Sequence, residues 1–317
     1  MAANAPLKAL LGHHVIGRHY ITALRQPSLL EKIEMVLATG DPKTGTYLGR
    51  ETGRDTFYDV QIATAGMDAT VLTFKDRTAA EDIGQFRRDF VANVSHELRT
   101  PLTALQGFIE TLGGAARDDA DARTRFLAIM EREANRMSRL VDDLLSLSRV
   151  EANERVRPVA RVVVADVVSR TVLELEPVLA SAGASVRIKD DSGGQPVPAA
   201  PEELRQVFGN LIENAVKYGA NGGEVLVTLD APAKDARLRG EGLRVRVTDQ
   251  GQGIASHHIP RLTERFYRID SHRSREVGGT GLGLAIVKHI INRHRGRLDI
   301  TSEVGAGTTV SVLLPTC

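Results

Sequence analysis

Two long segments near the middle of the chain carry apolar residues at helical spacing. In residues 81–112 these residues recur at steps of three and four, which places them along one face of a helix. Pro101 lies inside this helix and lacks a backbone donor, so it predicts a bend just after His96. A second helix with a charged opposite face is predicted after Gly113, Gly114 and a polar turn at residues 115–122. The pattern therefore predicts a helical hairpin.

The apolar stripes of this hairpin are long on both helices. They consist of Ile83, Phe86, Phe90, Val94, Leu98, Leu102, Leu105, Ile109 and Leu112, and of Phe126, Met130, Met137, Leu140, Leu144 and Leu147. Two helices alone cannot cover both stripes, so we expect the hairpin to pair with a second copy in an antiparallel four-helix bundle. A homodimer is thus expected on structural grounds.

The segments on either side of the hairpin mix helical and strand patterns. Before it, short apolar patches and two alternating runs at 56–62 and 69–74, joined by a turn at Gly66, Met67 and Asp68, predict a small α+β unit closed by a β-hairpin. After a polar hinge at 153–158, the pattern predicts an α/β sandwich. Its predicted helices are 162–179, 202–218 and 282–293, and its predicted strands are 185–189, 224–229, 243–248, 297–302 and 308–314.

Composition narrows the functional classes. The 317 residues suffice for two or three domains, and 41 basic against 40 acidic residues give a net charge of +1, which offers no attraction for nucleic acid. The single cysteine, Cys317, excludes an intramolecular disulfide. No window has the roughly 20 apolar residues of a membrane span. His13, His14 and His19 are expected to be polar surface residues instead of haem or metal ligands.

His96 lies between stripe positions of the first helix and is therefore expected to face solvent. A lone helical histidine is ordinarily a surface or capping residue, so its neighbours decide its role. The adjacent carboxylate of Glu97 can accept a hydrogen bond from one ring nitrogen, which would fix the tautomer and stabilise a developing cation on the ring. Thr100 lies one helical turn beyond Glu97.

Four separated pieces of the last third of the chain suit nucleotide chemistry. Asn210, Asn214 and Lys217 share one helical face that ends at Tyr218, and Asn214 offers an amide oxygen suited to Mg²⁺. Lys217 would offset phosphate charge. Residues 249–254 combine one carboxylate, which can accept from an adenine amine, with two glycines.

The other two pieces follow in the sequence. Residues 279–284, GTGLGL, stand directly before an apolar helix, where backbone N–H groups can meet phosphate oxygens, although many plain turns have this pattern too. Residues 264–270, with Phe266 and Arg268, lie in a long polar segment that is predicted to be a mobile lid. His257 and His258 in the same segment are expected to be solvated.

Residues 95–102, SHELRTPL, resemble the phosphoacceptor box of the sensor histidine kinases. The four pieces are similar, in order, to the N, G1, F and G2 boxes of that family's Bergerat-type ATP-binding domain, and the resemblance covers residues 81–315. It implies autophosphorylation of His96 by ATP with Mg²⁺, and transfer to an aspartate of a response-regulator receiver domain in trans. Thr100 would place a water that dephosphorylates the regulator. The implied nucleotide residues are Asn210, Asn214, Lys217, Tyr218, Asp249, Gly251, Gly253, Ile254, Phe266, Arg268, Gly279, Thr280, Gly281, Leu282, Gly283 and Leu284, with Asn214 also the metal ligand.

The resemblance also implies an α+β multidomain architecture. Residues 1–78 resemble a degenerate PAS sensory domain, 79–152 the dimerisation and phosphotransfer hairpin, and 158–317 the ATP-binding catalytic domain. This arrangement most resembles the phosphate-regulon sensor kinases. The chain is expected to be cytoplasmic. Because most of the family is membrane-anchored, it is expected to be either a free protein or the cytoplasmic portion of an inner-membrane protein.

Two departures from the family pattern leave alternatives open. Gln250 stands where the family usually has asparagine, and Asn210 stands where related ATPases carry a catalytic glutamate, which favours transfer over hydrolysis. A nucleotide-driven conformational clamp would need neither His96 nor Glu97. A sensory or scaffold module with a degenerate catalytic domain is disfavoured, because Asn214, Asp249, Gly251, Gly253, Gly281 and Gly283 are all present.

Overall fold

The computed structural model describes the chain except residues 52–53, 67–68, 155, 220–222, 239, 270–278 and 317. It divides into two compact units, Met1–His96 and Glu97–Cys317. The predicted turn residues Met67 and Asp68 lie outside the described part, as does Asp270 of the predicted lid. None of the described helices combines the length and apolar character that a membrane-crossing helix needs.

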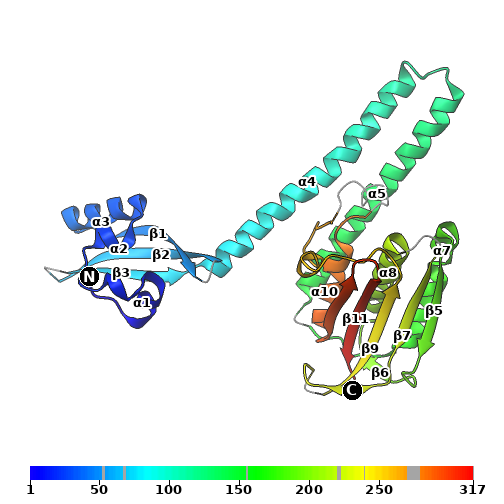
Figure 1. Ribbon diagram of the computed structural model, residues 1–317. Helices are drawn as coiled ribbons and strands as arrows, with labels where there is room; N and C mark the ends of the chain where they lie inside the picture. The colour runs from blue at the N-terminus through cyan, green and yellow to red at the C-terminus, as the bar shows by residue number, and fades with distance from the viewer. Residues whose placement is uncertain are drawn as a thin grey trace. The chain divides into compact units, whose positions relative to one another are not determined.

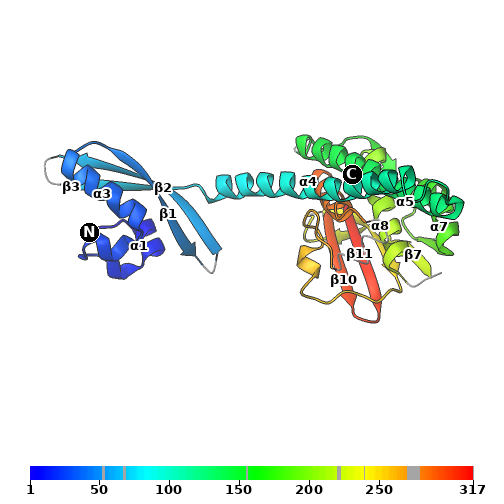
Figure 2. The same cartoon turned by 90° about the horizontal axis from the view of Figure 1, so that it is seen from above.

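The first unit packs short helices against a three-stranded sheet (Figures 1 and 2). Its helices are α1 (Ala5–Leu11), η1 (His13–Val15), α2 (Tyr20–Leu24) and α3 (Pro27–Thr39), and its antiparallel strands are β1 (Lys43–Glu51), β2 (Arg54–Ala65) and β3 (Ala69–Asp76), in the order β1-β2-β3. Leu29, Ile33 and Val36 of α3 are buried with Val60 and Ile62 of β2. The small α+β unit and its closing hairpin are present. His13, His14 and His19 are exposed, as predicted.

Strand β1 is absent from the sequence prediction, because glycines dilute its pattern. Gly45 pairs with Val60 on the face that α3 covers. A Cβ atom at Gly45 would lie 2.7 Å from Cδ1 of Leu29, so the missing side chain lets α3 approach the strand. An alternating pattern loses its apolar member at such a position, and the strand is set by pairing with β2.

The predicted hairpin consists of α4 (Thr78–Gly113) and α5 (Ala120–Ala152), and Pro101 lies inside α4 as predicted. Asp119 caps α5, because its carboxylate accepts a hydrogen bond from Ala122 N at 2.8 Å. Near the connection, the rings of Phe108 and Phe126 stack with their centroids 5.2 Å apart. These contacts join the two helices at the closed end of the hairpin.

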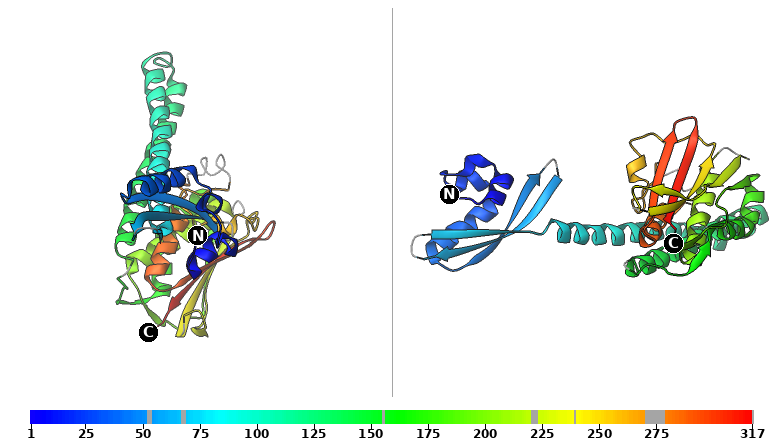
Figure 3. Two further views of the ribbon diagram at one scale, coloured as in Figure 1. Left: turned by 90° about the vertical axis from the view of Figure 1, so that its left-hand side faces the viewer. Right: turned by 90° about the horizontal axis from the view of Figure 1, so that it is seen from below.

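The rest of the second unit is built on a mixed sheet (Figures 1 and 3). Among the described strands the order is β10-β11-β9-β7-β5, with β8 paired to β9, and only the pair β5 and β7 is parallel. The strands are β5 (Ser185–Asp190), β7 (Glu224–Leu229), β8 (Ala233–Asp235), β9 (Gly240–Asp249), β10 (Arg297–Glu303) and β11 (Gly307–Pro315). The strands predicted in this region are therefore present, β8 being additional.

Helices cover this sheet and form the second layer of the sandwich. They are α6 (Val164–Glu174), α7 (Glu176–Ala182), α8 (Pro201–Tyr218) and α10 (Gly283–Arg293), with a short 3₁₀ turn η2 (Ile259–Arg261) and a small separate pair of strands, β4 (Arg161–Val163) and β6 (Pro196–Pro198). Leu204, Phe208, Leu211 and Ile212 of α8 are buried. The predicted α/β sandwich is confirmed in its helices at α8 and α10.

The single helix predicted over residues 162–179 is wrong. Residues 161–163 form β4, α6 ends at Glu174, and α7 begins at Glu176. Pro177 has no backbone N–H and its ring would clash with the preceding helical turn, so the chain starts a new helix there. The apolar residues keep a nearly helical spacing across this break, so the break could not be predicted from their spacing.

His294, just after α10, is a fully buried residue that the pattern did not single out. Its Nε2 accepts a hydrogen bond from the backbone N of Ala200, the residue before α8, at 3.0 Å. Its Nδ1 therefore carries the proton and donates to Ile290 O at 2.8 Å. Burial lowers the pKa of His294, and Arg293 beside it acts in the same direction. The neutral ring thus ties the start of α8 to the end of α10.

We expect the free energy of unfolding to fall as the pH is lowered from about 7.5 to about 5.5. The folded chain keeps His294 neutral, whereas the unfolded chain protonates it below about pH 6.5, so this residue removes up to about 1.4 kcal/mol at the lower pH. Urea unfolding of the full chain and of His294→Gln, which keeps an acceptor and does not titrate, measures the difference.

Glu203 lies close to His294 and to Arg293, and burial raises the pKa of its carboxyl. A raised carboxyl pKa makes the folded state gain stability as the pH falls, which is opposite to the effect of His294. Glu203 is present in both proteins, so the difference between them reports His294. The same pH dependence in both proteins would contradict the assignment.

Candidate functional site

Helix α8 carries the first of the four predicted nucleotide pieces. Because its apolar face is buried against the sheet, the polar residues of this piece lie on the other side of the helix. Asn214 and Lys217 are half-buried, and Nζ of Lys217 pairs with Oε2 of Glu213 at 2.7 Å. The amide of Asn210 donates to Gly283 O at 3.5 Å, so it joins α8 to the first residue of α10. Asn210 thus links two of the predicted pieces, while Tyr218 at the end of the helix is exposed.

Asp249 ends β9 and is held by backbone groups. Its Oδ1 accepts from Gly251 N at 2.8 Å and from Thr308 N at 3.3 Å. Burial raises the pKa of the Asp249 carboxyl, and the two hydrogen bonds oppose that rise. Because both bonds go to Oδ1, the carboxylate is oriented by its own loop and by β11.

The glycines beside Asp249 allow three backbone segments to approach one another. A side chain at Gly251 would overlap the carbonyl oxygen of Tyr218 at the end of α8, and one at Gly253, where φ is +68°, would overlap that of Glu303 in β10. Ile254 N donates to Ser302 Oγ at 2.8 Å. The loop after β9 is therefore in backbone contact with α8 on one side and with β10 on the other.

The second glycine piece, residues 279–284, is hydrogen-bonded to the predicted lid segment at residues 264–270. Phe266 N donates to Gly281 O at 2.8 Å, and a Cβ at Gly281 would lie 2.9 Å from Cα of Phe266. Both residues have positive φ, +74° for Gly281 and +62° for Phe266, the latter uncommon for a residue with a side chain. Leu282 is buried before α10, whereas Gly279 and Leu284 are half-buried.

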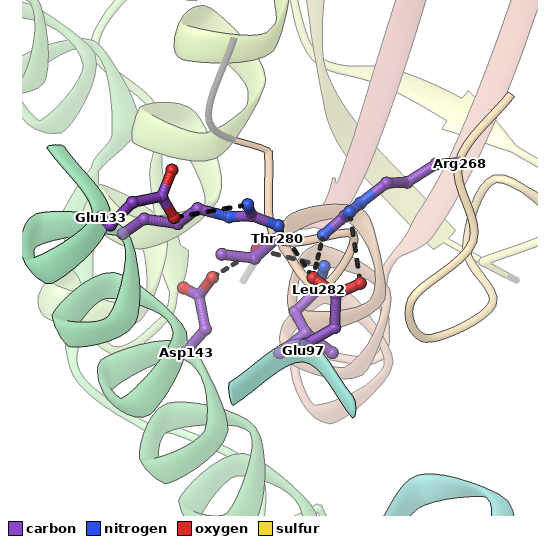
Figure 4. A network of polar contacts seen from close by, with 7 residues as sticks. Glu97, Glu133, Asp143, Arg268, Thr280 and Leu282 are labelled. Carbon is purple, nitrogen blue, oxygen red and sulfur yellow. Dashed lines mark hydrogen bonds and ion pairs between the residues drawn. The ribbon is translucent and has the colours of Figure 1, made fainter. Parts of the chain in front are cut away.

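Arg268 and Thr280 make polar contacts with the helical hairpin (Figure 4). Nη2 of Arg268 lies 3.0 Å from Oε2 of Glu97, and Arg136 Nη2 approaches the same oxygen at 2.9 Å. Thr280 Oγ1 donates to Asp143 Oδ2 at 2.6 Å. Burial raises the pKa of the Asp143 carboxyl, and Glu213 adds to that rise. The helical hairpin and the nucleotide pieces are therefore linked through two carboxylates, one on each helix of the hairpin.

Sequence reasoning missed Asp143 and Arg136, and it missed the hydrogen bond of His258. The charged face of α5 offers no signal that separates Asp143 from its neighbours, because its partner comes from a segment far away in the chain. His258 is half-buried, and its Nδ1 lies 2.6 Å from the hydroxyl of Tyr267, over whose ring Arg261 packs at 4.2 Å. His257 is exposed, as expected.

The structure thus brings the N, G1, F and G2 pieces into contact around the ends of α8, β9 and α10. Their part in binding nucleotide stays a prediction. Within the described ranges, no cluster of three or more His, Cys, Asp or Glu side chains is placed to hold a metal ion. A metal that shares its ligands with phosphates and water, as Mg²⁺ does, needs no such cluster.

Two domain families match the chain. The His Kinase A (phospho-acceptor) domain matches residues 86–153, which include His96, Glu97 and Thr100. The histidine kinase-, DNA gyrase B- and HSP90-like ATPase domain matches residues 199–317, which include all four nucleotide pieces. The hairpin and the sandwich therefore each correspond to a known domain.

Known relatives agree with these domains. The phosphate regulon sensor protein PhoR of Pseudomonas aeruginosa is 42% identical over 243 residues, which cover 75% of this chain and 52% of PhoR. The sensor-like histidine kinase SenX3 of Mycolicibacterium smegmatis is 35% identical over 286 residues, which cover 84% of this chain and 72% of SenX3. The alignment thus spans about half the length of PhoR.

Solved structures also resemble this one. The histidine kinase AdeS of Acinetobacter baumannii aligns with a TM-score of 0.53 at 25% identity, covering 70% of this chain and 98% of AdeS. Full-length ShkA in complex with AMPPNP aligns with a TM-score of 0.51 at 27% identity, covering 72% of this chain and 46% of ShkA. Because SenX3 is matched over most of its length and both domains occur in the order expected, the chain belongs to the sensor histidine kinase family.

Proposed function

We propose that this chain is a protein-histidine kinase that phosphorylates His96 with ATP and passes the phosphoryl group to an aspartate of a response regulator in trans. The observation that carries this proposal is the convergence of the four nucleotide pieces in a chain whose helical hairpin presents an exposed histidine next to a carboxylate. A nucleotide-driven clamp would use the same convergence but has no use for His96. The AMPPNP bound in the ShkA structure supports ATP as the nucleotide.

The nucleotide site would use the carboxylate of Asp249 to accept a hydrogen bond from the adenine amine, through the oxygen not engaged by the two backbone donors. The loop at residues 279–283 and the start of α10 would offer N–H groups to the phosphates. The half-buried amide of Asn214 fits Mg²⁺, which takes one or two protein oxygens and completes its shell with phosphates and water. When bound, Mg²⁺ would neutralise phosphate charge beside Lys217.

The transfer step forms a bond from a ring nitrogen of His96 to the γ-phosphorus and breaks the bond from that phosphorus to the β,γ-bridging oxygen, which leaves with ADP. Glu97 would accept a hydrogen bond from the other ring nitrogen and so stabilise the positive charge that develops. Thr100 would place a water for hydrolysis of the phosphorylated regulator. Decay of a phosphorylated regulator mixed with the His96→Ala chain would test this second activity, because that variant cannot return the phosphoryl group.

The assembly we propose is a homodimer built through a four-helix bundle, with a PAS-like unit at 1–78, the hairpin at 79–152 and the catalytic domain at 158–317. Large apolar side chains of the hairpin support it, because they are exposed in one copy. Leu102 is 48% exposed, Ile109 58% and Leu127 52%. The identity with PhoR supports a place in phosphate-responsive regulation.

The acceptor assignment predicts that His96→Ala abolishes phosphorylation of the chain. Incubation with γ-labelled ATP and Mg²⁺ should label the unmodified chain with an acid-labile, base-stable phosphate and leave the variant unlabelled. Nucleotide affinity should stay the same, because His96 belongs to none of the nucleotide pieces. His257→Ala, an exposed histidine of the lid segment, is the matched control and should keep the label. Label that persists on His96→Ala would overturn the assignment.

The role of Asp249 predicts that Asp249→Asn weakens ATP binding by about 10- to 100-fold, the range for hydrogen bonds to charged groups. The amide oxygen can keep the bonds to Gly251 and Thr308, which turns the amide nitrogen toward the adenine amine, a donor against a donor. Calorimetric titration measures the change.

Asp230→Asn is the matched control for this measurement. Asp230 follows β7, donates its backbone N–H to Arg244 O and pairs with Arg246 at 2.6 Å, in the middle of β9 and away from the loop after Asp249. It should leave ATP affinity unchanged. Equal affinity of the unmodified chain for ATP and GTP would show that Asp249 does not read the base.

The dimer predicts that Leu102→Asp or Ile109→Asp converts the chain to a monomer, because each would place an unpaired carboxylate inside the bundle. Sedimentation of the full chain measures the change. Thr103→Asp adds the same charge at an exposed polar position of α4 and should leave the dimer intact. An unmodified chain that sediments as a monomer would contradict the bundle.

A further inference from the structure

Two carboxylates of the helical hairpin lie on groups of the proposed nucleotide site (Figure 4). Asp143 of α5 accepts a hydrogen bond from the hydroxyl of Thr280, and Glu97 of α4 accepts hydrogen bonds from the guanidinium of Arg268. All four residues belong to the second compact unit. The two contacts come from different helices of the hairpin and reach different nucleotide pieces, so they form two independent links.

The first link places a negative charge where a phosphate is expected. Oγ1 of Thr280 lies 2.6 Å from Oδ2 of Asp143 and also accepts from Leu282 N at 3.3 Å, immediately before α10. The hydroxyl and the backbone N–H groups at the start of this eleven-residue helix are the donors that would hold phosphate oxygens. A phosphate bound there must displace Asp143 or lie beside its carboxylate, and like charges at such a distance repel.

The charges around Asp143 do not remove this conflict. Glu213 raises the pKa of the Asp143 carboxyl together with burial, whereas Lys217, Arg139 and the Thr280 hydroxyl act in the opposite direction. Lys217 is itself paired with Glu213 at 2.7 Å. The carboxyl is therefore held partly desolvated against the glycine loop by its hydrogen bond to Thr280.

The second link uses an arginine that would otherwise suit phosphate. Nη1 and Nη2 of Arg268 face the two carboxylate oxygens of Glu97 at 3.5 and 3.0 Å, the forked arrangement that a guanidinium also makes with phosphate. The side chain of Arg268 is only 8% exposed. Because Arg136 also binds Glu97 at 2.9 Å, Glu97 is held by two guanidinium groups. An Arg268 that turns to a phosphate must leave Glu97.

We propose that Asp143 and Glu97 compete with the phosphates of the bound nucleotide for Thr280 and Arg268, so that the hairpin lowers the affinity of the site for ATP. This inference rests on the proposed function. Binding of the nucleotide would break both links, and the release of Arg268 would leave Arg136 as the remaining guanidinium partner of Glu97. Asp143 is thus a determinant of nucleotide affinity that is contributed by a helix of the phosphoacceptor hairpin.

The test compares Asp143→Asn with Asp142→Asn in the full chain. Asp142 is the exposed neighbour on the same helix, so its substitution removes the same charge without touching Thr280. Calorimetric titration with a non-hydrolysable ATP analogue and Mg²⁺ should show about tenfold tighter binding to Asp143→Asn than to the unmodified chain, and no change for Asp142→Asn.

Adenosine serves as the second probe, because it carries the base without phosphates. Its affinity should be the same for all three proteins, which also shows that the variants keep a folded site. Analogue binding to Asp143→Asn that is unchanged or weaker would overturn the competition, as would an equal gain for adenosine. An unmodified chain that binds neither probe would instead refute the proposed function.

Discussion

The burial of one face of α8 against the central sheet is the contact on which the candidate site depends. This face includes four buried side chains, Leu204, Phe208, Leu211 and Ile212. The burial of each stabilises the fold by about 1.5–3 kcal/mol, so together they fix the rotation of the helix about its axis. Once that rotation is fixed, Asn210 meets α10 and the end of α8 meets the loop after Asp249. Polar chemistry is therefore positioned by an apolar interface on the other side of the same helix.

The loops around this helix can converge only because side chains are missing from them. At Gly253 a positive φ is combined with a carbonyl oxygen where a Cβ would lie, and at Gly281 with the backbone of Phe266. Both conditions are met by glycine alone, since a side chain would strain the backbone and also collide. An ordinary turn needs glycine for its positive φ alone. Gly253 and Gly281 are needed for a second reason, because another backbone segment occupies the place of a Cβ atom.

The second unit contains Glu97 of α4, the whole of α5 and the nucleotide pieces, and several of the contacts between them are ionic. Carboxylates on α4 and α5 meet a guanidinium and a hydroxyl of the nucleotide pieces, and Arg265 also pairs with Glu151 of α5. Charged contacts of this kind can be exchanged for contacts with a charged ligand, which an apolar interface cannot offer. The interface between hairpin and sandwich is thus suited to respond to the charge of a bound nucleotide.

Much of this protein is determined by local sequence. The apolar spacing of α4 and α5 predicts the hairpin, and α8, α10, β5, β7, β10 and β11 are predicted close to their observed ends, because each has a side that must be buried. The order of the short boxes also predicts the domains that match residues 86–153 and 199–317. Motifs of this kind can be read because the chemistry needs particular residues at fixed local spacing.

Tertiary structure alone decided the features whose partners lie far apart in the chain. Strand β1 has a glycine, Gly45, at a core-side position and is set by pairing with β2, and the break at Pro177 divides a segment that is helical by spacing. His294 and Asp143 gain their roles from Ala200 and Thr280, and His258 gains a polar contact with Tyr267. Periodicity reports which side of an element is buried, but it carries no information about which distant polar group a side chain will meet, because that depends on how the packed elements place both residues.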